Sequence, residues 1–245
     1  MTPLVVASYN IHRGVGLDRR LDLDRVASVI AEIGAEIVGL QEVLDDQLAW
    51  LAAALGMTLV MGEVRALGAG TYGNAVLTRL PVLAARGCDL SHGAREPRGA
   101  LRVDLGLDGN PGLHVFNCHF GLAFGERRAQ MALLTEFIRL SRCVGPRVVM
   151  GDFNEWHRGP VTRGLRREFA SPMRRLRRTH PAVLPLFKLD RIYWDAELEG
   201  DEVHVHRSRL ARMASDHLPV VARLRVRHAR VTRPWVTGVA LPPAE

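Results

Sequence analysis

Short apolar runs separated by polar turns recur along the chain and predict a protein rich in β-strands. The clearest run is residues 101–107, where apolar residues occupy every second position, as in a strand with one buried face. The break at residues 108–112, Asp-Gly-Asn-Pro-Gly, is a turn signal that leads into the next run. Strands are predicted at residues 4–12, 36–43, 58–61, 74–78, 82–88, 100–107, 113–120, 147–150, 189–194, 202–206 and 218–226.

Other segments have the spacing of apolar residues that is typical of amphipathic helices. Either Asp22 or Asp24 can cap the start of the first of them, and Gly34 follows its last apolar residue. Gly56 ends the second in the same way. Helices are predicted at residues 22–33, 46–55 and 127–140, with a further helix after the strand at 147–150.

The order of these elements predicts the fold class. Strands and helices alternate, a meander of strands follows, and the alternation then resumes before the final strands. Because sheets and helices must bury their apolar faces against one another, we expect an α/β (α+β) protein, a four-layer αββα sandwich of two mixed β-sheets flanked by helices. No linker-like run interrupts residues 1–227, so they are expected to form one domain. Residues 228–245 contain three prolines and no periodicity, and are expected to be a C-terminal tail.

Basic residues outnumber acidic ones, 33 against 26, and the formal net charge is +7. This balance suits anionic partners such as nucleic acid, phosphorylated metabolites or lipid headgroups. However, Lys188 is the only lysine, and a chain rich in Arg, Ala, Gly and Leu is also what a GC-rich genome produces. The sequence leaves both explanations of the charge open.

The cysteines and the first residues indicate a compartment. Cys88, Cys118 and Cys143 are an odd, scattered set without a C-x-x-C pair, as is usual for small buried residues in a reducing environment. The first residues do not resemble a signal peptide, and no apolar run approaches the ~20 residues that span a bilayer. We therefore expect a soluble cytoplasmic protein and assume a monomer.

Residues that can carry chemistry follow several of the buried runs, where each predicted strand ends or begins. A carboxylate at such a place is costly to bury unless it is paired or bound to a metal, and sites collect at the strand ends of packed α/β sheets. One such residue alone is best explained as a solvated strand end, whereas their recurrence predicts a shared phosphate or metal site. The residues are Asn10, Glu42, His119, Asp152, Asn154, Asp190, Asp216 and His217.

The motifs that contain these residues resemble those of the endonuclease/exonuclease/phosphatase (DNase I-like) superfamily. They occur in the family's order and span nearly the whole predicted domain, and the later motifs at this spacing are highly specific. The matching pieces are Ser8-Tyr9-Asn10-Ile11-His12, Leu40-Gln41-Glu42, Gly73-Asn74-Ala75-Val76-Leu77, Asn117-Cys118-His119, Gly151-Asp152-Phe153-Asn154, Leu189-Asp190-Arg191-Ile192 and Ser215-Asp216-His217-Leu218-Pro219.

The resemblance implies a hard divalent cation, Mg²⁺ or Mn²⁺. Glu42, helped by Asn10, would hold it, and Asp216 would reach it directly or through water. Oxygen ligands of this kind, few in number, suit such cations and leave bound waters in place.

The resemblance also implies the catalytic residues. Asp152 would orient and deprotonate the attacking water, and Asn154 would hydrogen-bond that water and a phosphate oxygen. His217, paired with Asp190, would act on the pentacoordinate phosphate by donating a proton or stabilising charge. His119 would donate to a non-bridging oxygen.

Other polar residues are expected to touch substrate. Asn74 would support His119, although an Asn after Gly73 could equally cap a turn. Arg98 sits where family members often place a basic residue near the cleft. An arginine cluster is expected either to steer polyanions such as nucleic acid or to form a solvated helix face. Its members are Arg163, Arg166, Arg167, Arg174, Arg175, Arg177 and Arg178.

The remaining histidines lack the spacing of zinc ligands, so zinc is not expected. His12 and His157 flank motif residues and are expected to be loop histidines without a role in the site. Surface or strand positions are expected for His92, His114, His180, His204 and His206.

Together these features predict a metal-dependent phosphoesterase that hydrolyses a phosphodiester or phosphomonoester with an activated water. The substrate could be a lipid, a nucleotide or a nucleic acid. An endonuclease or exonuclease acting on DNA or RNA is the alternative, although His119 stands where abasic-site nucleases of the superfamily carry Asn. A non-catalytic phosphate- or nucleic-acid-binding module on the same fold is disfavoured, because Asp152, Asn154 and His217 are all present.

Overall fold

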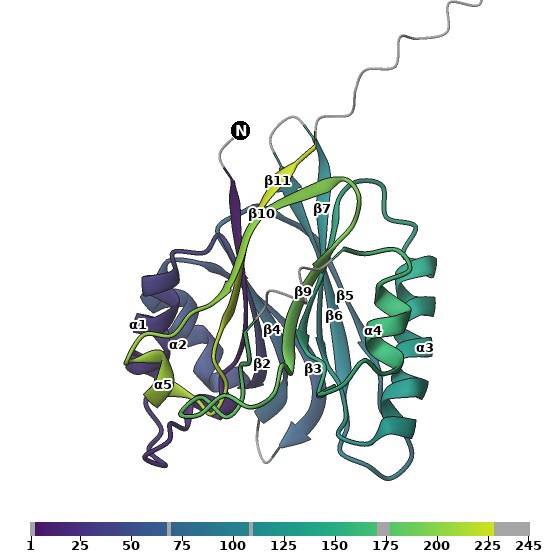
Figure 1. Cartoon of the computed structure of the whole chain (residues 1–245). Helices are drawn as coiled ribbons and strands as arrows, with labels where there is room; N and C mark the ends of the chain where they lie inside the picture. The colour runs from purple at the N-terminus through teal and green to yellow at the C-terminus, as the bar shows by residue number, and fades with distance from the viewer. Residues whose placement is uncertain (1–2, 68–69, 108–109, 171–176, 228–245) are drawn as a thin grey trace, which may run out of the picture.

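Two β-sheets pack face to face in the computed structural model, with helices on their outer faces (Figure 1). The structure describes residues 3–67, 70–107, 110–170 and 177–227. One sheet has six strands in the order β10-β11-β1-β2-β4-β3, and the other has five in the order β5-β6-β7-β8-β9. The strands are β1 (Leu4–Asn10), β2 (Ile37–Leu44), β3 (Thr58–Leu67), β4 (Gly70–Thr78), β5 (Val82–Asp89), β6 (Gly99–Leu107), β7 (Asn110–His119), β8 (Arg147–Asp152), β9 (Asp190–Trp194), β10 (Leu198–Val205) and β11 (Val220–Val226).

The helices form the two outer layers. In Figure 1, α1 (Leu23–Ile33), α2 (Asp45–Leu55) and α5 (Ala211–Ala214) lie beside the six-stranded sheet, and α3 (Phe124–Leu140) and α4 (Pro160–Leu165) lie beside the five-stranded one. A short 3₁₀ turn, His12–Gly14, follows β1. None of the helices in the described part of the chain is both long and apolar enough to cross a membrane.

Local chemistry explains where α1 begins and ends. The Asp22 side chain accepts a hydrogen bond from the Arg25 amide at 2.9 Å, which caps the first turn. Gly34 then ends the helix in the left-handed conformation, with φ +64°. Between these caps the helix buries Val26, Val29 and Ile30, which belong to the same apolar core as the six-stranded sheet.

Mixed pairing brings the ends of several strands to the same edge. β1 and β2 run parallel, as do β7 and β8, whereas β8 and β9 are antiparallel. His119 at the end of β7 pairs with Asp152 at the end of β8, which in turn pairs with Asp190 at the start of β9. The register therefore places three of the predicted site residues side by side across one sheet.

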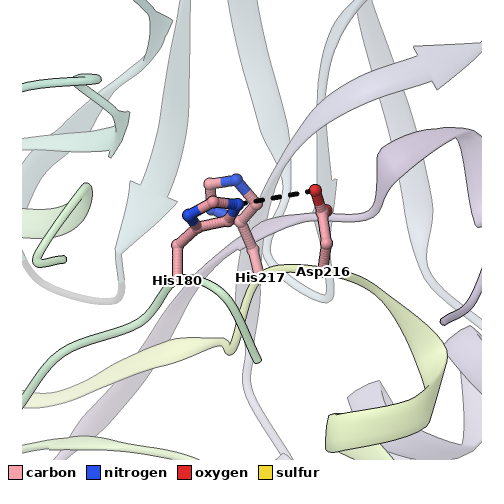
Figure 2. Close-up of side chains that lie close together, drawn as sticks. All are labelled: His180, Asp216 and His217. Carbon is pink, nitrogen blue, oxygen red and sulfur yellow. Dashed lines mark ion pairs between the residues drawn. The ribbon is translucent and has the colours of Figure 1, made fainter. Parts of the chain in front are cut away.

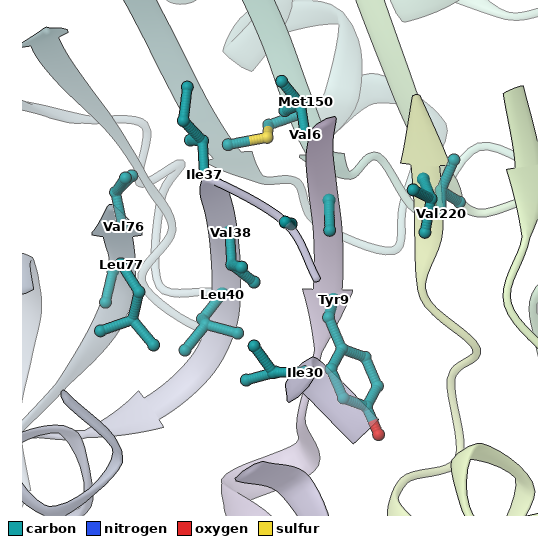
Figure 3. Close-up of a cluster of buried hydrophobic side chains, with 14 of the residues drawn as sticks. Val6, Tyr9, Ile30, Ile37, Val38, Leu40, Val76, Leu77, Met150 and Val220 are labelled. Carbon is teal, nitrogen blue, oxygen red and sulfur yellow. The ribbon is translucent and has the colours of Figure 1, made fainter. Parts of the chain in front are cut away.

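Buried apolar side chains fill the space around the six-stranded sheet and between the sheets. Figure 3 shows Val6, Leu40, Val76, Met150 and Val220 in this cluster, contributed by strands from both sheets. The packing excludes water over the length of the sandwich, which is the main favourable term for a fold of this kind.

A polar cross-link passes through this apolar interior. Gln41 on β2 donates to the Asn117 side-chain oxygen on β7 at 2.6 Å, and Asn117 donates to the carbonyls of Leu40 and Ala75, each at 2.8 Å. Gln41 and Asn117 are completely buried. Because an unpaired buried amide is costly, these bonds favour one alignment of the two sheets over others.

The αββα fold class predicted from the sequence is confirmed. The predicted strands at 58–61 and 74–78 were too short, because β3 and β4 form a longer hairpin that runs to Leu67 and Gly70. The helix predicted near the arginine cluster is only the short α4. The predicted tail, residues 228–245, lies outside the described residues.

Candidate active site

A bulge in β2 turns Glu42 toward the other sheet. The pairing of β2 with β4 shifts register between Leu40 and Val43, and Glu42 within the bulge has a left-handed backbone, with φ +55°. A left-handed backbone is energetically unfavourable for a residue other than glycine, and strained residues of this kind are often found at functional sites. The Glu42 side chain is 22% exposed and reaches the cleft between the ends of the sheets.

Asn10, at the end of β1, connects Glu42 to Asp152 of the opposite sheet. Its amide nitrogen donates to Glu42 Oε1 at 3.0 Å and to Asp152 Oδ2 at 3.1 Å. Its side-chain oxygen accepts from the His12 amide at 3.0 Å. In this arrangement the amide nitrogen, not the oxygen that could bind a cation, faces the two carboxylates.

His119 lies over the same pair of carboxylates. Its Nε2 is 3.7 Å from Asp152 Oδ2 and 3.9 Å from Glu42 Oε1, and its Nδ1 is 3.1 Å from Arg98 Nη1. A guanidinium group only donates, so His119 Nδ1 accepts and the ring proton is on Nε2. Burial and the charge of Arg98 lower the pKa of His119 to about 3, which keeps the ring neutral.

Arg98 is itself held by Glu96, because its Nη2 donates to Glu96 Oε2 at 2.8 Å. The Arg98 side chain is 6% exposed, whereas the Glu96 side chain is 43% exposed at the surface. A chain of contacts thus runs from the surface through Glu96 and Arg98 to the buried His119.

Asp152 is oriented through both of its oxygens. Oδ1 accepts from the Asn154 amide at 2.9 Å, and Oδ2 accepts from Asn10. Asn154 has a left-handed backbone, with φ +47°, and its side-chain nitrogen donates to the Phe120 carbonyl at 2.9 Å. That nitrogen is also 3.4 Å from His119 Nε2. Because Nε2 carries a proton, we interpret this contact as a near approach of two donors.

His217 approaches the same oxygen of Asp152 as His119 does. Its Nδ1 is 2.8 Å from Asp190 Oδ2, and its Nε2 is 3.7 Å from Asp152 Oδ2. Burial alone would lower the pKa of His217, but the charges of Asp190 and Asp152 outweigh it and raise the pKa to about 10. The ring is therefore an imidazolium at neutral pH, and both of its nitrogens donate.

The residue next to Asp190 has a different partner. Arg191 is completely buried and pairs with Glu155, at 3.2 Å from Nη1 to Oε2, and the same nitrogen donates to Thr162 Oγ1 at 2.8 Å. Asp190 is thus paired with the imidazole, and the Arg191–Glu155 pair ties β9 to the loop after β8.

Asp216 lies beside this centre with histidines near both oxygens. Its Oδ2 is 3.7 Å from His180 Nε2, the ion pair drawn in Figure 2, and its Oδ1 is 3.9 Å from His12 Nδ1. The His180 ring packs against the His217 ring, with 4.6 Å between centroids. Burial would raise the pKa of Asp216, but the His180 hydrogen bond and the charge of His217 lower it to about 2.

These groups meet at one cleft of about 380 Å³. Its polar floor includes Glu42, Asp152, Asn154, His119 and His217, and Arg98 lies in its wall. Glu96 lies beside Arg98 in the wall, and the remaining side is apolar or aromatic and is formed by Leu122, Trp156, Phe187 and Leu189, with His180 beside them.

The sequence missed part of this wall. His180 was expected at a surface or strand position, and it does lie in an isolated β-bridge with Phe187, but its half-buried ring also lines the cleft, which was not expected. Trp156, Phe187 and Leu122 were not singled out at all. Nothing in the sequence places them near the site except that Trp156 and Leu122 closely follow motif residues.

Asn74 lies behind the cleft. It is buried in β4, and its side-chain nitrogen donates to the Gly99 carbonyl of the opposite sheet at 2.8 Å. It therefore neither caps a turn nor lines the cleft, and it links the two sheets next to Arg98. The role in substrate binding expected from the resemblance has no contact in the structure to support it.

The arginine cluster does not line the cleft either. Arg163 lies in α4, and Arg166 and Arg167 follow that helix, all of them exposed. Arg177 and Arg178 are exposed just before His180. The other two members, Arg174 and Arg175, lie outside the described residues. The cluster is thus a solvated surface in the described part of the chain.

The fold and the site together define an αββα sandwich with a carboxylate–imidazole centre at one edge of both sheets. Residues 7–217 match the model of the Endonuclease/Exonuclease/phosphatase family, and the chain belongs to that family. Members of this family are typically metal-dependent phosphoesterases.

Individual proteins resemble the chain over nearly its full length. The uncharacterized protein YbhP of Escherichia coli (strain K12) is 31% identical over 242 residues, which cover 89% of this chain and 95% of YbhP. A conserved protein of unknown function from Enterococcus faecalis V583 has a similar structure, with a TM-score of 0.80, 21% identity, and coverage of 91% of this chain and all of that one. The mannosyl-6-phosphatase Bt3783 of Bacteroides thetaiotaomicron VPI-5482 has a TM-score of 0.75 and 22% identity over 91% of this chain and 99% of its own.

Proposed function

We propose that this chain is a phosphoesterase that uses Mg²⁺ or Mn²⁺ to hydrolyse a phosphodiester or phosphomonoester. The observation that carries the proposal is the environment of Asp152, a buried carboxylate whose Oδ2 lies 3.7 Å from His119 Nε2 and 3.7 Å from His217 Nε2. A base with two imidazole groups beside it suits a substrate that carries negative charge on several oxygens.

The donor set at the cleft fits a hard divalent cation. Glu42 and Asp152 line the cleft, and Asp190 and Asp216 lie behind it, in contact with its histidines His217 and His180 respectively. Arg98 is committed to Glu96 and His119. Carboxylates in excess of nearby positive charge are what Mg²⁺ and Mn²⁺ require.

In the proposed site, Glu42 would hold the cation with help from Asn10, and Asp216 would reach it directly or through water. Asn10 would have to turn its amide to offer its oxygen. When bound, the cation supplies positive charge to the phosphate oxygens and to the attacking water.

The side chains account for the proton transfers. Asp152 accepts a proton from the water whose oxygen forms the new bond to phosphorus. The ester P–O bond breaks, the leaving oxygen takes a proton from His217 Nε2, and the proton on Asp152, whose Oδ2 is 3.7 Å from that nitrogen, returns to the ring. His119 donates its Nε2 hydrogen to a non-bridging oxygen. His217, held by Asp190, stabilises the charge of the pentacoordinate phosphate, and Asn154 orients the water.

The proposal is tested by turnover of bis-p-nitrophenyl phosphate with Mg²⁺ or Mn²⁺. Asp152→Asn, which keeps the shape of the side chain, should lower kcat by about 10²- to 10⁴-fold. Asp24→Asn, at an exposed position in the first turn of α1, is the matched control and should retain the parent rate. Equal rates for the parent and Asp152→Asn would refute the proposal.

A further inference from the structure

Exposed apolar side chains lie on the segments that contribute the apolar wall of the cleft. They come from the loop after β7 and the first residue of α3, the loop after β8 and the loop before β9, and their exposed fractions lie between 50% and 68%. We call this set the apolar rim, and it consists of Leu122, Phe124, Trp156, Val183, Leu184 and Leu186. Large apolar side chains clustered in this way usually mark a surface that contacts something apolar.

The loop of residues 181–187 is firmly held, so the exposure of its apolar residues is built into the fold. The Phe187 amide donates to the His180 carbonyl at 2.8 Å, and the Thr179 amide donates to the Phe187 carbonyl at 2.7 Å. Ala182 within the loop is buried, and its amide donates to the Asp216 carbonyl at 2.7 Å. These bonds fix both ends of the loop, while Val183, Leu184 and Leu186 project into solvent.

The apolar rim is continuous with the wall of the cleft. Trp156 packs edge-on against Phe187, with 5.3 Å between ring centroids, and both line the cleft together with Leu122. A substrate with its phosphate at Asp152 would therefore pass over apolar surface on its way out of the cleft.

The loops that form the apolar rim carry only positive charge. Residues 120–125, 156–159 and 177–189 contain no Asp or Glu, but they include Arg158, Arg177, Arg178 and Lys188. Arg207 joins them, because its Nη2 donates to the Arg178 carbonyl at 3.0 Å. Burial and the nearby charges of Arg177 and Arg212 lower the pKa of Arg207, which shows that further arginines lie close to it.

We propose that the apolar rim docks on an anionic phospholipid surface, and that the cleft then takes a phospholipid phosphate ester as its substrate. The second part of this inference rests on the proposed function, and the first does not. Aliphatic side chains combined with adjacent arginines bind such surfaces, because the apolar groups enter the interface and the cations neutralise lipid phosphates. Nucleic acid fits less well, since four of the six rim residues are aliphatic and offer bases no aromatic face, and only Phe124 and Trp156 could stack on a base.

Binding can be measured without turnover by co-sedimentation with vesicles. The Asp152→Asn chain in EDTA should bind vesicles of phosphatidylglycerol and phosphatidylcholine more tightly than vesicles of phosphatidylcholine alone. Adding Leu184→Ser and Leu186→Ser, neither of which lines the cleft, should weaken binding by about 10-fold or more. The matched control is Leu83→Ser with Val144→Ser, exposed apolar residues at the opposite end of the five-stranded sheet, and it should bind like its parent.

Several outcomes would overturn the docking surface. The proposal fails if the chain does not bind anionic vesicles, or if it binds them equally with and without the Leu184 and Leu186 substitutions. It also fails if these substitutions weaken the binding of single-stranded DNA but not the binding of vesicles. A dimer in light scattering that these substitutions dissociate, without loss of vesicle binding, would assign the apolar rim to a second copy of the chain.

Catalysis is tested with the otherwise unmodified chain and Mg²⁺. The ratio of phosphatidylglycerol hydrolysis in vesicles to bis-p-nitrophenyl phosphate hydrolysis should fall about 10-fold in Leu184→Ser/Leu186→Ser. Vesicle binding without hydrolysis of either compound would sink the proposed function and leave the docking surface standing. Hydrolysis of the soluble diester with an unchanged ratio would sink the docking surface and leave the proposed function standing.

Discussion

Arg98 Nη1 lies 3.1 Å from His119 Nδ1, and this contact determines which nitrogen of the imidazole carries the proton. Arginine cannot accept a hydrogen bond, so the Nε2 of His119 is the protonated nitrogen that faces the cleft. The interaction gives Arg98 a positioning role, which differs from the direct phosphate contact expected from the sequence. Glu96 completes the arrangement by fixing the other end of the guanidinium.

Replacing Arg98 should disturb the tautomer of His119 before it disturbs the fold. Arg98→Lys removes the fixed geometry of the donor, and we expect kcat for bis-p-nitrophenyl phosphate to fall by about 10²-fold while KM changes little. The ¹⁵N chemical shifts of the His119 ring should show a mixture of tautomers. Arg86→Lys on the exposed strand β5 is the control. An unchanged tautomer together with an unchanged kcat would show that Arg98 has no such role.

Asp190 and His217 are expected to act as one unit, because Asp190 Oδ2 holds His217 Nδ1 at 2.8 Å. Asp190→Asn and His217→Ala should each lower kcat by a large factor, and the double variant should be little worse than the poorer single variant. Kinetics normalised to folded protein make the comparison. Strictly multiplicative losses would contradict the coupling.

The neighbouring pair Arg191–Glu155 gives a contrasting control. It is buried but lies outside the cleft wall, so Glu155→Gln should lower the free energy of unfolding by about 3–5 kcal/mol because it leaves a buried guanidinium without its partner. The rate per folded molecule should stay near that of the parent. If Glu155→Gln lowered kcat as much as Asp190→Asn does, the Arg191–Glu155 pair would contribute to catalysis and not only to stability.

Glu42 is expected to control cation affinity. Glu42→Gln keeps the size of the side chain but removes its charge, so the Mg²⁺ concentration needed for half-maximal activity should rise by about 10-fold or more. Titration of Mg²⁺ against activity, and calorimetry without substrate, measure the effect independently. Glu136→Gln, an exposed residue of α3 paired with Arg139, should leave both unchanged. Full activity of the parent in excess EDTA would exclude the cation altogether.

His114, away from the cleft, should make stability depend on pH. Hydrogen bonds with Cys143, and then with Asp104 and the Val144 carbonyl, raise its pKa from 6.5 to about 9 against the opposing effect of burial. A raised pKa in the folded state means that the protonated ring stabilises the fold. This contribution is complete below about pH 6.5 and is lost as the pH rises through about 9.

Denaturant unfolding in EDTA at pH 6, 8 and 10 checks this prediction. The difference in unfolding free energy between the parent and His114→Asn should shrink as the pH rises across this range. His92→Asn, at an exposed position, should follow the parent at every pH. A difference that stays constant across the range would count against a protonated His114.

The site residues at the strand ends could be predicted from the sequence because they are charged or polar residues that adjoin buried apolar strands. Asp152 and Asp190 adjoin apolar strands, and charged residues are placed there only when something compensates for their burial. The register then brings them together, since neighbouring strands in one sheet end at a common edge. The order of the motifs indicated which of these residues belong to the site. The helix caps at Asp22 and Gly34 could be predicted from local residue preferences.

The missed features depend on contacts between loops. Phe187 contacts both Trp156 and His180 because of the path of an irregular loop, and no periodicity predicts such a path. Asn74 was misjudged for a related reason. A polar residue near a motif looks like a ligand, and only the packing of one sheet on the other shows its bond to the Gly99 carbonyl.

The cross-link between Gln41 and Asn117 has a consequence for how this protein can change. Asn10 and Glu42 belong to one sheet, and His217 lies in the loop that leads into strand β11 of that sheet, whereas His119, Asp152 and Asp190 belong to the other. A slide of one layer over the other by a single residue would separate Glu42 from Asp152 while most of the apolar interior stayed covered. Mutational drift in the sandwich interior should therefore abolish chemistry well before it unfolds the chain, and the centre of the molecule should tolerate less variation than its stability alone requires.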